Sequence, residues 1–472
     1  MSNPEHAPGQ LPAWWDPDQP FVDDYPDTRS AQQLSDDQHR VRRQVVNLGL
    51  RGQDASIRRE LLRAIIQRRN VRLASAAEPT RQLFEPVLSE RGFEMLIAGG
   101  ELLIRSEALE DPRVQEFLEA VPFGQAEDER EFIDGLDGRV VRLVNRTLPS
   151  HRLDDVARFL RRRGVQVSLN HIAPSGPVGK ALAGPEPTEA TLEFSATDPI
   201  GDVDVAVVDT GIAADTRTDG WLAQAYVPRD GIQTGPNEDP LYDPPPLPQV
   251  LTMSAGHGSS VAGVIQRVEP GSRILVYRAL DEDGLNDEVQ VAIAMVQAVR
   301  NGAGILNLSL GTETVDDQPP IAMQVALELI DEHGGDEVAI VAAAGNYGST
   351  RPCWPAAFRR VVSVASLTWD GRPSDWSNRG FWIDCSTVGE GLLTPYVEGV
   401  ESALIDWEPD RFTGPNPWAL WSGTSFAAPQ VAGAIARLCR TGRTPRQAVR
   451  ELLRTGMSLP DFGKAFRFLP GT

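Results

Sequence analysis

The sequence predicts an α/β fold with a parallel, doubly wound sheet, and two observations in its C-terminal part support this. Near-continuous apolar runs recur there at Val203–Val208, Ile274–Leu280, Ile305–Leu310, Val338–Ala343 and Val361–Ala365. Helical patterns at Asp287–Arg300 and Ile321–His333 alternate with these runs. Strands that are apolar throughout and alternate with helices indicate a parallel sheet covered on both faces. We assign this part, residues 199–472, to one domain.

A small α+β domain is predicted ahead of it at residues 81–175. Strand patterns at Phe93–Ala98 and Glu101–Glu107 flank Gly99-Gly100, which predicts a hairpin. The rest of the domain is predicted to contain helices at Asp111–Ala120 and Leu153–Arg163 and strands at Arg139–Arg146 and Val165–His171. Residues 176–198 follow as a linker, because glycine and proline are frequent at their start.

Residues 1–80 are predicted to form an acidic arm followed by an arginine-rich helical segment. Up to about residue 39 few side chains could anchor a core, which indicates a helical or irregular arm that lies on another surface. Between Arg40 and Arg72 there are ten arginines, and an amphipathic helix is predicted from the apolar face Ile57, Leu61, Leu62, Ile65 and Ile66. Its basic face either is solvated or docks the acidic arm or an acidic partner.

Composition restricts the classes of function. The net charge of −21 argues against nonspecific binding to nucleic acid or to anionic lipid. No apolar stretch approaches the roughly 18 residues of a membrane helix, and the N-terminus lacks the basic and apolar regions of a secretory signal. The three cysteines, Cys353, Cys385 and Cys439, are too few for a disulfide framework or a zinc cluster. We therefore expect a cytoplasmic protein without a nucleic-acid or membrane partner.

Ser425 opens a predicted helix within Trp421–Arg437. The apolar residues after it, Ala428, Val431, Ala432, Ile435 and Leu438, recur at three- and four-residue steps, as on a helix with one buried face. Pro429 is expected in the first turn, where its missing N–H has no partner to lose. Ser425 would then lie where free backbone N–H groups and the helix dipole favour negative charge.

Three more polar side chains lie at element ends of the same predicted sheet. Asp209 and Asn346 each follow a strand, and His257 opens a helix in Gly-His-Gly-Ser-Ser. Because a serine hydroxyl is a weak nucleophile, it needs a base and a third group that orients the base. Asp209, His257 and Ser425 would supply these roles, with Asn346 and the Ser425 N–H as oxyanion donors. Each motif alone is commonly structural, but their shared place at one sheet favours catalysis.

At these motifs the chain resembles the subtilisin-like serine proteases, the subtilases, over roughly residues 199–460. The matching words are VVDTGI at 207–212, HGSSVAGVI at 257–265, AAAGN at 342–346 and GTSFAAPQVAG at 423–433. Their order along the chain, Asp, His, Ser, is that of subtilisin. The resemblance implies a sheet of subtilisin type, a triad of Asp209, His257 and Ser425, and Asn346 as oxyanion donor. It also implies that Ser309, Leu310 and Gly311 bind the substrate backbone.

Two features differ from the family pattern, and one loop raises the question of a metal. The chain carries an insertion rich in Pro, Asp and Gly at Pro228–Val250, predicted to be a surface loop, and Thr387-Val388-Gly389 lacks a proline that the family often has. No cofactor is required by the proposed chemistry. The family often binds calcium, and Asp281-Glu282-Asp283-Gly284 is a candidate loop, although the dipole of the next helix also accounts for acidic residues there.

We interpret the chain as a serine endopeptidase that acts on a peptide or protein substrate through an acyl-enzyme on Ser425. The unit at 93–175 is similar in content to the inhibitory prodomains of subtilases, so we expect the N-terminal region to restrain the enzyme until a regulatory protein partner displaces it. Recruitment of a substrate is the other role open to this region. The alternative for the whole chain is a sensing or binding protein whose protease fold is held inactive. A serine esterase of the α/β-hydrolase type fits worse, because Ala427 stands where its motif needs glycine.

Overall fold

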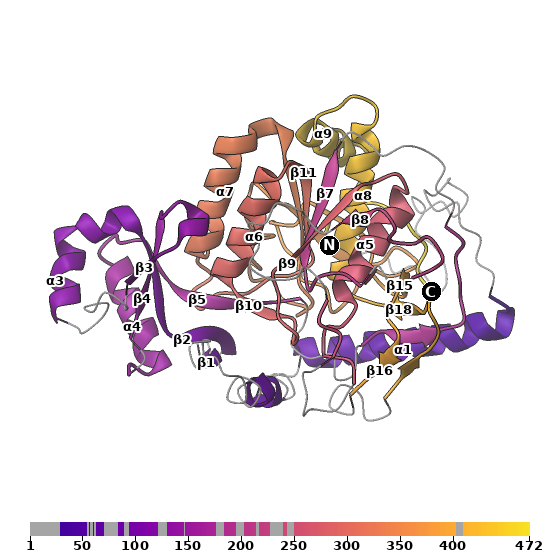
Figure 1. The fold of residues 1–472 in the computed structure, drawn as a ribbon, viewed down its shortest axis with the longest axis horizontal. Coiled ribbons are helices and arrows are strands. Elements are labelled where there is room, and N and C mark those ends of the chain that lie inside the picture. The colour runs from indigo at the N-terminus through magenta and orange to yellow at the C-terminus, as the bar shows by residue number, and fades with distance from the viewer. Residues whose placement is uncertain are drawn as a thin grey trace.

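A nine-stranded sheet forms the centre of the computed structural model (Figure 1). The structure describes residues 29–53, 56, 60, 63–69, 84–88, 94–120, 130–145, 147–175, 184–194, 203–213, 217–226, 239–242, 250–402 and 409–472. The strand order is β19-β20-β14-β13-β12-β11-β7-β9-β8, and every pair is parallel except the antiparallel edge pair β19–β20. All five predicted strands are present, as β7 (Asp204–Asp209), β9 (Ile274–Arg278), β11 (Ala303–Leu308), β12 (Ala339–Ala343) and β13 (Val362–Leu367).

Helices cover both faces of this sheet, as an α/β fold requires. Along β7, Val205 and Val207 pack in the core that includes α5 (His257–Val268) and α8 (Thr424–Cys439). The alternate residues Ala206 and Val208 pack in the core that includes α6 and α7 on the other face. The two predicted helices of that second layer are observed at Glu288–Arg300 and Ile321–Gly334. Helix α9 (Pro445–Thr455) begins at a capping box formed by Thr444 and Gln447.

Four short strands of this sheet were not predicted. They are β8 (Ala225–Tyr226), β14 (Cys385–Val388), β19 (Met457–Leu459) and β20 (Gly463–Ala465). The most central of them, β14, contains Ser386 and Thr387, which are fully buried. Polar residues in a buried strand give no apolar run, so the hydrophobic pattern could not reveal β14.

All three cysteines are buried and free, and burial raises the pKa of the Cys439 thiol to about 11.

The N-terminal part folds around a second sheet, antiparallel in every pair, of order β10-β5-β2-β4-β3 with β1 paired to β2. Its strands are β1 (Phe84–Leu88), β2 (Glu94–Arg105), β3 (Arg130–Phe132), β4 (Val140–Val144), β5 (Val167–Pro174) and β10 (Leu285–Asp287). Helices α3 (Pro112–Ala120) and α4 (Ser150–Arg161) complete it. The last strand, β10, comes from the C-terminal part of the chain, so this sheet joins the two parts (Figure 1).

The predicted hairpin at Gly99-Gly100 is wrong. Residues on both sides of the glycines belong to the single strand β2. Gly100 has a φ of +78°, and the register of β2 against β5 shifts between Ile97 and Leu102. The two glycines therefore mark a bulge that bends a continuous strand, a role for which glycine is as suitable as for a turn.

Helix α1 (Ala31–Gln53) begins inside the segment predicted to be an arm. Its buried face carries Asp37, Val41, Gln44 and Leu48. Two of these four residues are polar, so the apolar pattern did not reveal the helix. The predicted helix around Ile57 is described only in part, at residues 56, 60 and 63–69. In the described part of the chain, no helix is both long and apolar enough to cross a membrane.

Asp37 and Gln44 attach α1 to the C-terminal part. The Asp37 carboxylate accepts hydrogen bonds from Arg29 at 3.0 Å and from Thr188 Oγ1 at 2.7 Å. Gln44 Nε2 donates to the carbonyl of Leu420 at 3.2 Å. Thr188 belongs to β6 (Glu186–Thr188), which lies within the predicted linker and pairs with β18 (Trp418–Trp421), itself paired with β15 (Leu392–Pro395).

The packing of α5 against α8 depends on Gly433. A Cβ at this position would lie 2.8 Å from Val268 Cβ and 3.1 Å from the Ile265 carbonyl oxygen. We expect Gly433→Ala to lower the free energy of unfolding by about 1–3 kcal/mol, because overpacking outweighs the gain in helix propensity. The matched control is Gly49→Ala in α1, where a Cβ would meet nothing within 4 Å. It should be neutral or stabilising by about 0.5–1 kcal/mol. Urea unfolding of both variants measures this, and equal stability would contradict the packing argument.

Candidate active site

Asp209 and His257 form a hydrogen-bonded pair at the centre of the candidate site. Asp209 ends β7, and His257 is the first residue of α5. His257 Nδ1 lies 2.7 Å from Asp209 Oδ1, and both residues are buried. Since a carboxylate only accepts, Nδ1 donates to it and Nε2 is left as an acceptor. The rings of Trp421 and Phe426 pack on the imidazole, with centroids at 5.3 and 5.5 Å.

Ser425 is the second residue of α8, at the end of the helix where backbone N–H groups are free. Phe426, its neighbour, contacts the His257 ring, so the structure brings the serine to the same place as the pair. The hydroxyl Oγ can donate to either of two carbonyl oxygens, of Ser175 and Ser309, each at 3.1 Å. The serine side chain is thus turned towards the chain's own backbone.

The expectation that Pro429 lies in the first turn of α8 is wrong. It is the sixth residue of the helix, in the interior. A residue there would normally donate its N–H to the carbonyl four residues earlier, which is that of Ser425. The hydroxyl of Ser309 supplies the missing bond instead, at 2.8 Å from the Ser425 carbonyl oxygen. Pro429 therefore frees a carbonyl through which the predicted substrate-binding segment is attached to the serine.

Asn346 lies beside the same helix start. Its side-chain oxygen accepts from the backbone N–H of Thr424 at 2.9 Å and from the Thr424 hydroxyl at 2.8 Å. Because the oxygen accepts these two bonds, the Nδ2 group is oriented to donate elsewhere. It lies near Gly423, since a Cβ built on that glycine would be 3.5 Å from Asn346 Nδ2. Thr424 is therefore a residue that the sequence analysis missed and that fixes the orientation of the Asn346 amide.

The predicted substrate-binding residues Ser309, Leu310 and Gly311 follow β11, and the chain's own segment lies against them. Gly311 N donates to the carbonyl of Pro174 at 3.1 Å. On the opposite side, β5 pairs antiparallel with β10, with Pro174 opposite Leu285. Ser175 N donates to the Gly284 carbonyl at 2.9 Å. The end of β5 thus lies between two backbone edges and reaches the Ser425 hydroxyl.

The acidic loop considered for calcium faces arginines. Asp281 Oδ2 accepts from Arg69 Nε at 3.0 Å, and Asp283 lies 3.8 Å from Arg68 Nε. Guanidinium groups therefore stand where a cation would be needed, and the loop does not fit a calcium ion. Among the residues that the structure describes, no group of three or more His, Cys, Asp or Glu side chains could hold a metal ion.

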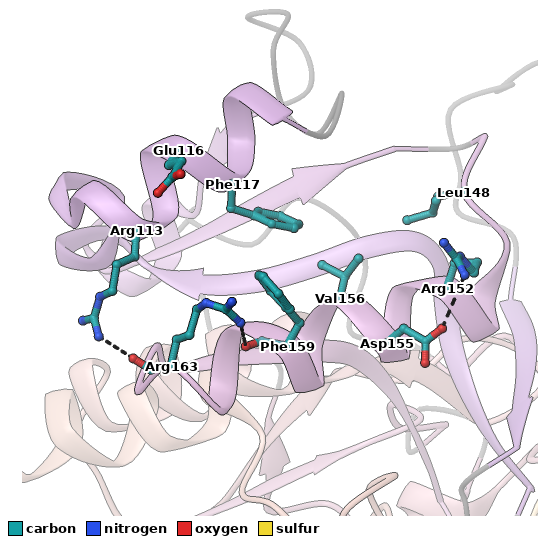
Figure 2. A pocket seen from close by; sticks show the side chains of 9 residues that line it. All are labelled: Arg113, Glu116, Phe117, Leu148, Arg152, Asp155, Val156, Phe159 and Arg163. Atoms are coloured by element: carbon teal, nitrogen blue, oxygen red, sulfur yellow. Dashed lines mark hydrogen bonds and ion pairs between the residues drawn. The ribbon is translucent and has the colours of Figure 1, made fainter.

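A cavity of about 530 Å³ lies far from these residues, on helices α3 and α4 (Figure 2). Its floor is apolar and includes Phe117 and Phe159, whose ring centroids are 6.0 Å apart. Its arginines interact with their neighbours: Arg163 lies over the Phe159 ring, and Arg113 pairs with Asp111 and the Arg163 carbonyl. The residues that line this cavity include no serine, threonine, cysteine, lysine or histidine, so we assign it no chemistry.

Comparisons with known proteins agree with the resemblance in the sequence. The family model described as the subtilase family matches residues 201–465. A thermophilic serine proteinase of Bacillus sp. (strain AK1) is 29% identical over 296 residues, which are 60% of this chain and 64% of that protein. Thermitase of Thermoactinomyces vulgaris is 27% identical over 277 residues, covering 55% of this chain and 83% of thermitase.

Solved structures extend the likeness to the fold. Fervidolysin from Fervidobacterium pennivorans, described as a keratinolytic enzyme related to subtilisin, matches with a TM-score of 0.55 and 18% identity. The match covers 82% of this chain and 63% of fervidolysin. At this identity the similarity concerns the fold alone, and it supports the predicted subtilisin type of sheet.

Proposed function

The chain belongs to the subtilase family, and from this premise we propose that it is a serine endopeptidase restrained by its own N-terminal region. The 2.7 Å bond between His257 and Asp209, beside the helix start that carries Ser425, is the observation that carries the proposal. We also propose a cytoplasmic location and domain boundaries after residues 80, 175 and 198. Both rest on the composition and the residue patterns of the sequence.

The proposed reaction assigns each of these residues a role that its contacts allow. Asp209 holds the His257 ring with Nε2 as the acceptor, so Nε2 can take the proton of Ser425 as the hydroxyl attacks a peptide carbonyl. Asn346 Nδ2 and the Ser425 N–H then stabilise the oxyanion. His257 returns the proton to the leaving amine, and water later releases the acyl group from Ser425 by the same steps.

The restraint is supported by the place of Ile172–Ser175. These residues form backbone hydrogen bonds with both edges that a substrate strand would use, as in recognition by strand addition. The Ser175 carbonyl also engages the Ser425 hydroxyl, which His257 needs for proton transfer. In this proposal the segment takes the place of a substrate strand, and the Ser175 carbonyl, like that of Ser309, competes with His257 for the proton of the Ser425 hydroxyl.

The sheet behind this segment covers α6 and α7. Leu103, Ile133 and Val140 of the N-terminal part share one core with residues of these helices, including Val289 and Val325. Glu288, which begins α6, is buried there, and this burial raises the pKa of its carboxyl. It accepts from the N–H groups of His171 at 3.4 Å and Ala322 at 3.2 Å. The contact is thus both apolar and specific, as a stable inhibitory interface would be.

Ala173→Asp in the full chain tests the restraint. Ala173 is fully buried in the core of the C-terminal part and pairs with Asn286 of β10. A charge there would be buried without a partner, which costs several kcal/mol and favours release of the segment. We expect peptide hydrolysis to rise by about tenfold or more, since each 1.4 kcal/mol is a factor of ten.

The matched control is Phe132→Asp, which places the same charge on an exposed residue of the same sheet, 53% accessible in β3. It should leave the rate unchanged. If Ala173→Asp folded and cut a short peptide no faster than the unmodified chain, the restraint would be wrong and recruitment would remain. A variant with the segment released but no hydrolysis at all would favour the sensing protein instead.

The triad is tested in the chain that carries Ala173→Asp. Adding Ser425→Ala or His257→Ala should lower turnover by at least about 10⁴-fold while thermal unfolding stays cooperative, because neither group works without the other. Labelling by a fluorophosphonate probe should be lost with Ser425→Ala. Turnover within tenfold of the parent would refute Ser425 as the nucleophile.

Asn346→Ala tests the oxyanion donor in the same background. Since the amide would interact with charge that develops only in the transition state, kcat should fall by about 10²- to 10³-fold with KM little changed. The matched control is Asn416→Ala, a half-buried residue whose amide bonds Thr218 and which should change neither constant. A raised KM with unchanged kcat would instead assign Asn346 to substrate binding.

A further inference from the structure

Asp239 is a buried carboxylate in a place where the sequence predicts a surface loop. It belongs to the insertion Pro228–Val250, and the residue is only 8% exposed. Its backbone N–H donates to the carbonyl of Ile212 at 3.1 Å, in the loop that follows β7. Shortly after it, the Leu241 carbonyl accepts from Thr252 N at 2.9 Å. Residues 239–242 of the insertion thus lie against the loop that follows the strand ending at Asp209 and against the segment that precedes the helix beginning at His257.

One oxygen of Asp239 joins the two halves of the Asp209–His257 pair. Oδ2 accepts from the N–H of Gly256, the residue before His257, at 2.7 Å. The same oxygen lies 3.4 Å from Oγ1 of Thr210, the residue after Asp209. The orienter and the base are therefore connected twice, directly through their side chains and again through this carboxylate.

The start of α5 depends on such a partner from outside the helix. Its N-cap is Gly256, at φ +74°, which has no side chain to cap the free N–H groups, and the first turn contains no acidic residue. A carboxylate at this end interacts favourably with the helix dipole. Thr210 Oγ1 adds a second contact by accepting from Gly258 N at 3.1 Å. The fit is close, since a Cβ at Gly258 would lie 2.1 Å from the Gly211 carbonyl oxygen.

We propose that Asp239 is a positioning residue of the proposed triad. It holds the first turn of α5 against the end of β7 and so sets the distance and direction from the His257 ring to Asp209. It acts through the Gly256 N–H and the Thr210 hydroxyl. The inference rests on the proposed function, because a position of the imidazole matters only if His257 is the base.

The test uses the full chain that carries Ala173→Asp, with kcat expressed per active site titrated by a fluorophosphonate probe. Asp239→Ala should lower kcat by about 10- to 100-fold and change KM by less than about twofold, because a misplaced base affects the transition state more than substrate binding. Asp239→Asn keeps an acceptor oxygen at the same place and should restore kcat to within about threefold of the parent. Thr210→Val removes the second contact and should lower kcat in the same direction, which keeps the test valid if Asp239→Ala does not fold.

Glu269→Ala is the matched control. Glu269 is a buried carboxylate at the other end of α5, where it accepts from Gly271 N at 3.3 Å and Arg440 at 2.7 Å. Its loss should lower thermal stability and leave kcat per active site unchanged. If Asp239→Ala behaved in the same way, or if Asp239→Asn were as slow as Asp239→Ala, the positioning role would be refuted while the peptidase assignment stood. A parent chain that neither cuts peptide nor reacts with the probe would refute the function and the inference together.

Discussion

The backbone pairing of Ile172–Ser175 with β10 and Gly311 is the interaction on which the relation between the two parts of the chain depends. A cleft that binds extended substrate must present unpaired N–H and C=O groups, and an exposed edge of this kind attracts any strand. Here the N-terminal sheet supplies the strand. The same groups would therefore serve two states, one satisfied by the chain itself and one by substrate, and the difference in free energy between these states decides how much enzyme is open.

Apolar contacts and ion pairs both contribute to the interface behind this strand, since Arg142 of β4, which is largely buried, lies 3.7 Å from Asp287 of β10. Arg139 pairs with Glu332 through two bonds of 2.7 Å, and Arg300 pairs with Asp137, but both pairs are partly exposed. Exposed pairs of this kind contribute about 0–1 kcal/mol each. The buried layer between β2, β4, α6 and α7 can contribute more to the stability of the interface, since it removes large apolar side chains from water.

The central strands and the grouping of the candidate site residues could both be predicted from the sequence, because both depend on local signals. Apolar runs give strands, and Asp209, His257, Asn346 and Ser425 lie next to element ends, where a parallel sheet gathers them. The features that were missed depend on contacts between distant segments. On the buried face of α1, Asp37 and Gln44 form hydrogen bonds with Thr188 and Leu420, which lie far along the chain. The Ser309 hydroxyl replaces the bond that Pro429 cannot make, and Asp239 acts from an insertion without periodicity. Composition alone cannot reveal such pairs.

The attachment of α1 affects how the proposed restraint would be released. The N-terminal sheet is connected to the C-terminal part by the linker after Ser175, and α1, which precedes the sheet, is itself docked through Val41 and Gln44. A segment tied in this way stays at a high effective concentration near the cleft even after its contacts open. Displacement of β5 is then an equilibrium within one molecule, which a substitution at Ala173 can shift. A truncated chain that begins near Thr191 would be a less direct test of the restraint than Ala173→Asp. It lacks α1 as well as β5, and Leu48 of α1 packs on Trp376. The truncation would remove this contact, which lowers stability, and would remove β5 as well. A change of rate in the truncated chain could therefore not be attributed to release of β5 alone.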